Sequence, residues 1–277
     1  MQRLIITADD YGMCEEVDQA IDDGIANGFI TTTNVMLNMQ TLDNAKSLRK
    51  RFPHLSVGIH WNVTSGKPVS PVDKVPSLVD ERGNFWSVAQ FKKRYSKGLI
   101  KPSELEYELE AQYALFESVC DHPDYWNTHE NSSLHTKAFY VFAGVALRHK
   151  VGATRTFQRV YFDKKSIGIK ASAREILVKW FFELWFSRIR RTFKMPTARV
   201  VRFKRSKTEG DALLDALKKD GRDLIEVVFH PATVAESEFF GNIAEERVSE
   251  YEFLSSEEIR KKYENAGFEF VGFDALT

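Results

Sequence analysis

The sequence predicts an α/β fold, a TIM-like (β/α) barrel of parallel strands covered by helices. Short apolar runs of strand length alternate with helical patterns of roughly ten to twenty residues, which is typical of a parallel sheet. Seven or eight such strands favour a closed or nearly closed barrel. The 277 residues, 43% of them hydrophobic, suffice for one large core, and no long Gly-, Ser- or Pro-rich linker divides them. We therefore expect a single domain over residues 1–277.

Strand and helix patterns follow one another closely in the first 63 residues. The β-favouring run RLIIT (3–7) predicts a strand, and 14–28 predicts a helix that ends at a glycine. The β-branched run FITTTNVML (29–37) predicts a second strand, 42–52 a helix, and LSVGIHWNV (55–63) a third strand. A long loop containing several prolines follows.

The alternation resumes after this loop. Ser103 and Glu106 have the spacing of a capping box at the start of an expected helix over 103–120. Further strands are expected at 124–129, 152–157, 200–203, 224–230 and 268–273, and further helices at 138–150, 173–193, 211–220 and 255–267.

The overall charge and cysteine content exclude several classes of protein. Lys plus Arg equals Asp plus Glu, 39 each, so no global basic field would attract nucleic acid. The two cysteines form no CxxC motif and favour free thiols in a reducing compartment. The first residues enter a strand without an apolar leader, and the aromatic stretch 178–186 is too short and too charged to span a membrane. We expect a cytoplasmic protein with no membrane span and no nucleic-acid partner.

Residues 148–207 are strongly basic, with eighteen Lys and Arg against three acidic residues. The expected helix 173–193 interleaves such cations with Trp and Phe. This pattern allows a helix that binds a membrane surface or nucleic acid. We favour a packed helix whose basic face is solvated or meets an acidic neighbour or a second subunit, which leaves a homodimer open.

Chemically active side chains stand at the ends of separate expected strands. In a parallel barrel the carboxyl ends of the strands converge on one face, where active sites lie. Residues that are distant in sequence are therefore expected to share one site. The residues at strand ends are Asp9, Asp10, His60, His129 and His230, and the expected strand 152–157 carries Arg155.

Two imidazoles and one carboxylate are a common ligand set for a divalent metal with open positions. A cation would offset the repulsion between Asp9 and Asp10, and the carboxylate that does not bind it could take a proton from water. A turn at Gly12 would let both carboxylates face the same site. A histidine could protonate the leaving group, and Arg155 could hold the base carboxylate or a substrate oxygen. The pattern predicts metal-assisted hydrolysis at a carbonyl centre.

Each of these residues also has a structural interpretation. Asp9 and Asp10 could form a turn or cap the following helix, and a lone histidine is more often structural than a ligand. We take the structural interpretation for His54, His122 and His149. His135 is either a third imidazole ligand or, as we favour from its spacing, a residue that supports the ligands or the fold without binding metal.

Four segments resemble the YdjC-like carbohydrate deacetylases, a family that includes chitooligosaccharide deacetylases. ITADDYG resembles their ADDFG opening, and VGIHWNVTSGKPV resembles their GLHLNLT-GxPV stretch. IEVVFHPA resembles their ElmxHPG segment, and the closing stretch from RVSEYEF to FEFVGF resembles theirs. The matches lie in the same order over nearly the whole chain. The resemblance implies an incomplete, distorted or seven-stranded barrel like that of the NodB deacetylases, one divalent ion (Mg²⁺ or Zn²⁺), and hydrolysis of an N-acetyl group on an amino sugar with release of acetate.

On the matching positions, the resemblance implies that Asp10, His60 and His129 bind the metal. It implies that Asp9 is the general base and His230 the general acid; the reverse order of the two aspartates is the alternative. The family often reads DSHxHxH where this chain reads NTHENSSLH. Asn131 and Ser133 thus replace two common histidines, which bears on metal identity and substrate preference, and His135 is a candidate replacement.

A sugar substrate would suit the aromatic residues beside the expected ligands. Tyr11 and Trp61 could each stack on a pyranose ring, and Asn62 is a further expected substrate-binding residue. Two alternatives remain open at this point: a glycosidase using paired carboxylates, and a sugar-binding barrel without activity. The absence of GxSxG and GxxxxGK[ST] motifs disfavours serine hydrolase and P-loop chemistry.

Overall fold

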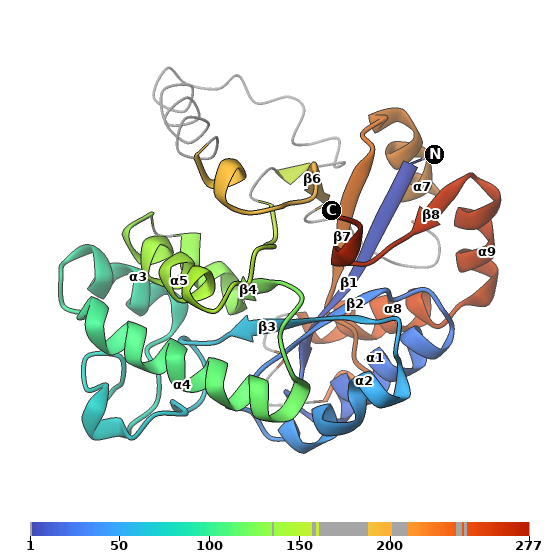
Figure 1. Ribbon diagram of the computed structural model, residues 1–277. Coiled ribbons are helices and arrows are strands. Elements are labelled where there is room, and N and C mark those ends of the chain that lie inside the picture. The colour runs from blue at the N-terminus through green and yellow to red at the C-terminus, as the bar shows by residue number, and fades with distance from the viewer. Residues whose placement is uncertain are drawn as a thin grey trace.

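The computed structural model describes residues 2–134, 136–156, 159–160, 188–200, 210–236, 240 and 243–276. Three predictions fall wholly or mostly outside these residues: the role of His135, the greater part of the expected helix 173–193, and residues 201–203 of the expected strand 200–203. In Figure 1 the helices of the described chain lie around a curled sheet of strands.

Eight described strands form one sheet, and all of their pairings are parallel. The order is β4 (Trp126–Thr128), β3 (Ser56–Trp61), β2 (Thr32–Val35), β1 (Gln2–Tyr11), β7 (Leu224–Phe229), β6 (Ala198–Val200) and β5 (Arg159–Val160). The eighth strand, β8 (Phe268–Phe270), pairs with the first residues of β1. The last residues of β1 pair with β2. The predicted parallel α/β fold is confirmed.

Isolated bridges join β4 to the segment before β5, and that segment to the one before β6. Trp126 of β4 pairs with Thr154, and Ala153 pairs with Lys194. The expected strand 152–157 is reduced, over its described residues, to these two contacts. The edge strands of the sheet are β4 and β5, and among the described residues only the isolated bridge from Trp126 to the segment before β5 spans the gap between them, so the sheet is a distorted form of the predicted TIM-like barrel.

The helices follow the predicted alternation with three differences. The described α-helices are α1 (Glu15–Ala26), α2 (Leu48–Arg51), α3 (Val88–Ser96), α4 (Pro102–Cys120), α5 (Thr136–Arg148), α7 (Gly210–Asp220), α8 (Ala244–Leu254) and α9 (Glu257–Asn265), and the 3₁₀ helices are η1 (Leu42–Ser47), η2 (Val72–Lys74), η3 (His129–Leu134) and η5 (Phe273–Ala275). The single helix expected at 42–52 is instead η1 followed by α2. Helix α3, which a Ser87–Gln90 capping box begins, lies in the expected loop, and α8 lies where no element was expected.

Aromatic packing fixes the strands from outside the barrel. Trp61 of β3 lies 5.5 Å from Trp126 of β4 and 5.8 Å from Phe142 of α5, measured between ring centroids. All three rings are fully buried. Burial of such large rings stabilises the fold strongly, so the carboxyl ends of β3 and β4 are held on a rigid base.

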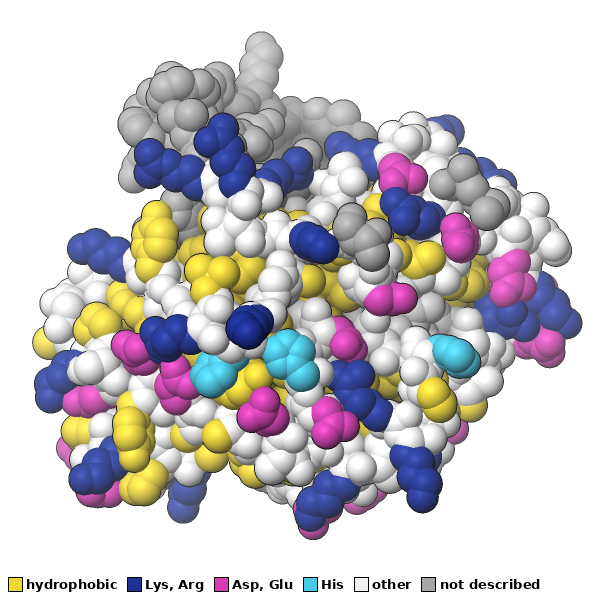
Figure 2. Space-filling model, viewed as in Figure 1, with side chains coloured by type: hydrophobic (Ala, Val, Ile, Leu, Met, Phe, Trp, Pro, Cys, Tyr) yellow, Lys and Arg dark blue, Asp and Glu magenta, His cyan; other side chains and the backbone are white. Residues whose placement is uncertain are grey.

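Among the described residues, none of the helices combines the length and hydrophobicity that crossing a membrane requires. Basic and acidic side chains are interspersed over the face shown in Figure 2, in keeping with a net charge of zero.

Candidate active site

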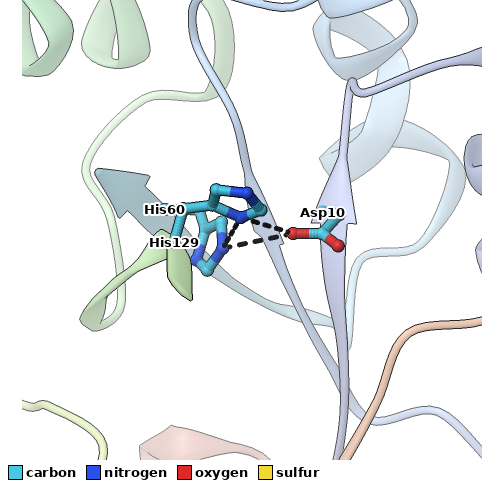
Figure 3. A group of neighbouring side chains, drawn as sticks. All are labelled: Asp10, His60 and His129. Atoms are coloured by element: carbon cyan, nitrogen blue, oxygen red, sulfur yellow. Dashed lines mark hydrogen bonds and ion pairs between the residues drawn. The ribbon is translucent and has the colours of Figure 1, made fainter. Parts of the chain in front are cut away.

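Three predicted metal ligands converge at the carboxyl ends of β1, β3 and β4 (Figure 3). Asp10 Oδ1 lies 3.3 Å from His60 Nε2 and 3.1 Å from His129 Nδ1, and the two nitrogens are 3.3 Å apart. Asp10 and His60 are buried, and the side chain of His129 is 14% exposed. The expected convergence of distant residues is therefore seen for these three side chains.

The donor atoms have the chemistry and the spacing that a small divalent cation needs. Metal–ligand bonds of about 2.1 Å place neighbouring ligand atoms about 3.0 Å apart in an octahedron and about 3.4 Å apart in a tetrahedron. The three separations here, 3.1 to 3.3 Å, lie within this interval. One carboxylate oxygen and two imidazole nitrogens suit either Zn²⁺ or a harder ion, so the residues present fit the expected group.

The backbone at Asp10 brings both carboxylates to the same site. Strand β1 runs on to Tyr11, with a change of register between Ala8 and Tyr11, and Asp10 has a φ of 77°. The sequence led us to expect the chain to leave the strand at Gly12. Instead an irregularity within β1 rotates Asp10 out of the strict alternation. Gly12, with a φ of 90°, then makes the turn, and a Cβ there would lie 3.0 Å from the carbonyl oxygen of Met36.

Asp18 of α1 holds this turn in place through hydrogen bonds. Its carboxylate accepts hydrogen bonds from the Gly12 backbone N–H at 2.6 Å and from Asn44 Nδ2 at 2.9 Å. The side chain is buried. Burial raises the pKa of Asp18 to about 6, and these hydrogen bonds offset only part of the effect.

We expect Asp18 to make stability depend on pH. Because its pKa is raised on folding from 3.8 to about 6, the stabilisation by the neutral form is fully present below pH 3.8 and is lost as the pH rises through 6. The free energy of unfolding should thus fall by up to about 3 kcal/mol from this group between pH 4 and 7. Urea titrations of Asp18→Asn should lack this slope, whereas Asp43→Asn, at a carboxylate that is 86% exposed, should keep it. An unchanged slope in Asp18→Asn would contradict the assignment.

Asp9 is held by Arg155. Arg155 Nη1 and Nη2 donate to the two Asp9 oxygens at 2.7 and 2.6 Å, and Asn34 Nδ2 donates to Oδ1 at 2.5 Å. Burial alone would raise the pKa of Asp9, but the charge and hydrogen bonds of Arg155 outweigh it and hold the pKa well below its ordinary value. Asp9 is thus ionised and oriented.

Asp10 has its own arginine. Arg247 Nη2 of α8 donates to Asp10 Oδ2 at 2.6 Å, which leaves Oδ1 facing the two histidines. Burial acts to raise the pKa of Asp10, but Arg247 and His129 lower it well below its ordinary value. Each of the two neighbouring carboxylates therefore has its own arginine, which supplies positive charge that we had expected from a metal cation alone.

His230 lies in the loop after β7, with Nε2 3.6 Å from Asp9 Oδ2. Its backbone N–H donates to the Glu250 carboxylate, and its carbonyl oxygen accepts from Arg247 Nη1 at 3.3 Å. Its side chain is 38% exposed. Desolvation lowers the pKa of His230, although Asp10 and Asp9 act in the opposite direction. Helix α8 therefore holds this histidine beside Asp9 and open to a ligand.

Four supporting residues were not singled out from the sequence for any role in the site. Arg247 and Glu250 share one face of α8 because they are three residues apart, and this spacing was the available signal. Asn34 lies on β2 and Glu226 on β7, the buried strands on either side of β1, and Glu226 Oε1 accepts from Arg155 Nε at 2.8 Å. For Asn34 and Glu226, which contact Asp9 and Arg155, the local sequence carries no comparable signal.

The prediction that Tyr11, Trp61 and Asn62 contact the sugar is wrong, because all three side chains are buried. The Tyr11 hydroxyl accepts from Arg51 at 2.8 Å, and Trp61 packs against Trp126. Asn62 Nδ2 donates to the Ser65 carbonyl oxygen, which anchors a loop. No ring face is available to a pyranose, so these side chains serve the core and the loop.

The structural interpretation of two other histidines agrees with their contacts. His149 stacks on Tyr113 at 3.7 Å, and His122 Nδ1 lies 3.1 Å from the Tyr113 hydroxyl. Neither residue contributes to the ligand cluster.

Comparisons with known proteins agree with this architecture. A carbohydrate deacetylase of Enterococcus faecalis is 28% identical over 285 residues, which cover 100% of this chain and 98% of that protein. A chitooligosaccharide deacetylase of Yersinia pseudotuberculosis is 32% identical over 136 residues, covering 48% of this chain and 49% of that protein. A solved structure from Enterococcus faecalis, of a proposed cellobiose-phosphate cleavage protein, is 25% identical with a TM-score of 0.78, covering 100% and 99% of the two chains. Residues 3–265 match the model of the YdjC-like protein family, and the chain belongs to that family.

Proposed function

We propose that this protein is a metal-dependent carbohydrate deacetylase that hydrolyses the N-acetyl group of an amino sugar or its oligosaccharide and releases acetate. One observation carries the proposal: the Asp10–His60–His129 cluster lies beside a second, separately held carboxylate, Asp9. The names of the relatives support the substrate class. One divalent ion, Mg²⁺ or Zn²⁺, is the expected cofactor.

Asp9 is the proposed general base. The ion, when bound, would polarise the acetyl carbonyl group and lower the pKa of water. Asp9 Oδ2 faces His230 and is fixed by Arg155, so it can accept the proton that water loses as its oxygen bonds to the acetyl carbon. Arg155 makes Asp9 a weak base but keeps it ionised, which suits a water molecule whose own pKa is lowered.

His230 is the proposed general acid. When the carbon–nitrogen bond breaks, the amine nitrogen of the sugar must gain a proton. A protonated His230 is a strong donor because its environment lowers its pKa. The hydrogen bonds from α8 to its backbone keep the ring at the mouth of the site.

The proposal is tested by metal content and acetate release. Mass spectrometry should find close to one equivalent of metal in the wild type, and acetate should be released from N-acetylglucosamine oligomers until a chelator is added. His60→Ala should lose both properties. His54→Ala, which removes an exposed imidazole, should keep both. Stoichiometric metal without turnover on any N-acetyl sugar would instead favour a binding protein.

A further inference from the structure

Asn127 connects the candidate metal ligand His60 with the arginine that holds Asp9. It lies on β4 and is buried. One atom of its amide is 2.5 Å from His60 Nδ1. The other atom faces Arg155 Nη1 and Nη2 and Asn34 Nδ2 at 3.2, 3.1 and 3.0 Å. The planar amide of Asn127 therefore lies between the imidazole of His60, which can donate or accept at Nδ1, and the NH groups of Arg155 and Asn34, which can only donate.

The partners on the Arg155 side are all donors. Guanidinium and amide NH₂ groups carry no acceptor, so the Asn127 oxygen is satisfied when it points toward Arg155 and Asn34. The amide NH₂ then points toward His60 and donates to Nδ1. The reverse orientation places NH₂ against three donors, and buried polar atoms left in that state are costly.

This orientation selects the tautomer of a neutral His60. If Nδ1 accepts from Asn127, the ring proton is on Nε2, from where it can donate to Asp10 Oδ1 at 3.3 Å. A histidine ligand needs the opposite arrangement, with a lone pair on Nε2 and the proton on Nδ1 facing an acceptor. Cation binding through Nε2 thus requires the Asn127 oxygen to turn toward His60 and lose its place beside Arg155.

We propose that Asn127 is a positioning residue that lowers the metal affinity of this site by favouring the tautomer of His60 that cannot bind metal. The inference rests on the proposed function for the identity of the ligands. A side chain with acceptors only would accept from Arg155 and from His60 Nδ1–H together. Asn127→Asp should therefore bind the metal more tightly, by about 10- to 100-fold, the usual effect of a residue that orients a ligand.

The experiment measures both the tautomer of His60 and the affinity of the protein for metal. Nitrogen-15 spectra of histidine-labelled, metal-free protein, recorded at a pH where the ring is neutral, should show the His60 proton on Nε2 in the wild type and on Nδ1 in Asn127→Asp. Isothermal titration with Zn²⁺ and Mg²⁺ gives the affinities. The negative charge added in Asn127→Asp could by itself tighten metal binding. The position of the His60 proton in the wild type is therefore the decisive result. A proton on Nδ1 in metal-free wild type would overturn the inference, as would equal affinities of the two proteins.

The two proposals fail in different ways. If the wild type and Asn127→Asp both bind no metal, the proposed function fails, because no ligand site exists. If the wild type binds metal and Asn127→Asp binds it no more tightly, only the role of Asn127 fails. Should Asn127→Asp not fold, the tautomer of the wild type with and without metal still tests the inference: a proton that stays on the same nitrogen would overturn it.

Discussion

Replacement of Asp9 by asparagine should lower the rate of acetate release by about 100- to 10,000-fold, the usual contribution of a general base, while metal content stays at the wild-type level. Asn is close to Asp in size and still accepts one hydrogen bond from Arg155. It cannot take a proton from water. The three proposed ligands are untouched by the change, so the substitution separates proton transfer from metal binding.

The matched control for this substitution is Asp223→Asn. Asp223 also pairs with an arginine, Arg3, but its side chain is 65% exposed and it lies in the turn before β7, outside the ligand cluster. Its loss should leave turnover and metal content unchanged. Turnover by Asp9→Asn near the wild-type rate would remove Asp9 from the mechanism. Loss of metal in Asp9→Asn would instead make Asp9 a ligand and exchange the roles of the pair.

The candidate site was predictable where strand topology alone decides position. Parallel strands end on one side of a sheet, so Asp10, His60 and His129 could be expected to meet although 119 residues separate the outer two. The number of residues between them does not matter for this argument. It required only that each residue stand at the end of its strand.

The alternation of side chains along a strand also explains why the prediction of a sugar contact for Trp61 was wrong. Neighbouring residues on a strand face opposite sides. Because His60 faces the ligand cluster, Trp61 must face the covering helices, where it packs on Phe142 of α5. Proximity in sequence to a site residue was therefore evidence against a substrate contact on a regular strand. The same rule fails at Asp9 and Asp10 because the backbone at Asp10 departs from regular geometry.

The sequence did not indicate the partner of Arg247, although its three-residue spacing from Glu250 places both residues on one face of α8. Its helix AEERVSEYEFL carries charges on several faces, so a hydrophobic stripe does not mark it. Arg247 is nevertheless buried against Asp10. A long-range ion pair of this kind is set by how α8 packs beside β1 and β7, and local sequence does not contain that information.

Arg155→Met is expected to destabilise the fold by about 3–5 kcal/mol, the effect of removing one partner from a buried ion pair. Arg155 lies between Asp9 and Glu226, and all three are buried. Burial alone would lower the pKa of Arg155, but the two carboxylates raise it above its ordinary value. Methionine fills a similar volume and leaves two like charges facing each other. Urea titration at pH 7 measures the loss.

A second substitution distinguishes lost charge pairing from lost packing. Glu226→Gln added to Arg155→Met removes one of the two orphaned charges, so the double variant should recover a measurable part of the stability. Lower pH should act in the same direction. In the wild type the pKa of Asp9 is depressed, so its stabilisation is present above pH 3.8 and lost as the pH falls below that value. Without Arg155, burial would raise the pKa of Asp9 instead, so the difference between the two proteins should shrink from pH 7 toward pH 4. A difference that is constant with pH and unaffected by Glu226→Gln would mean that Arg155 stabilises the barrel by packing, and that the orientation of Asp9 has another cause.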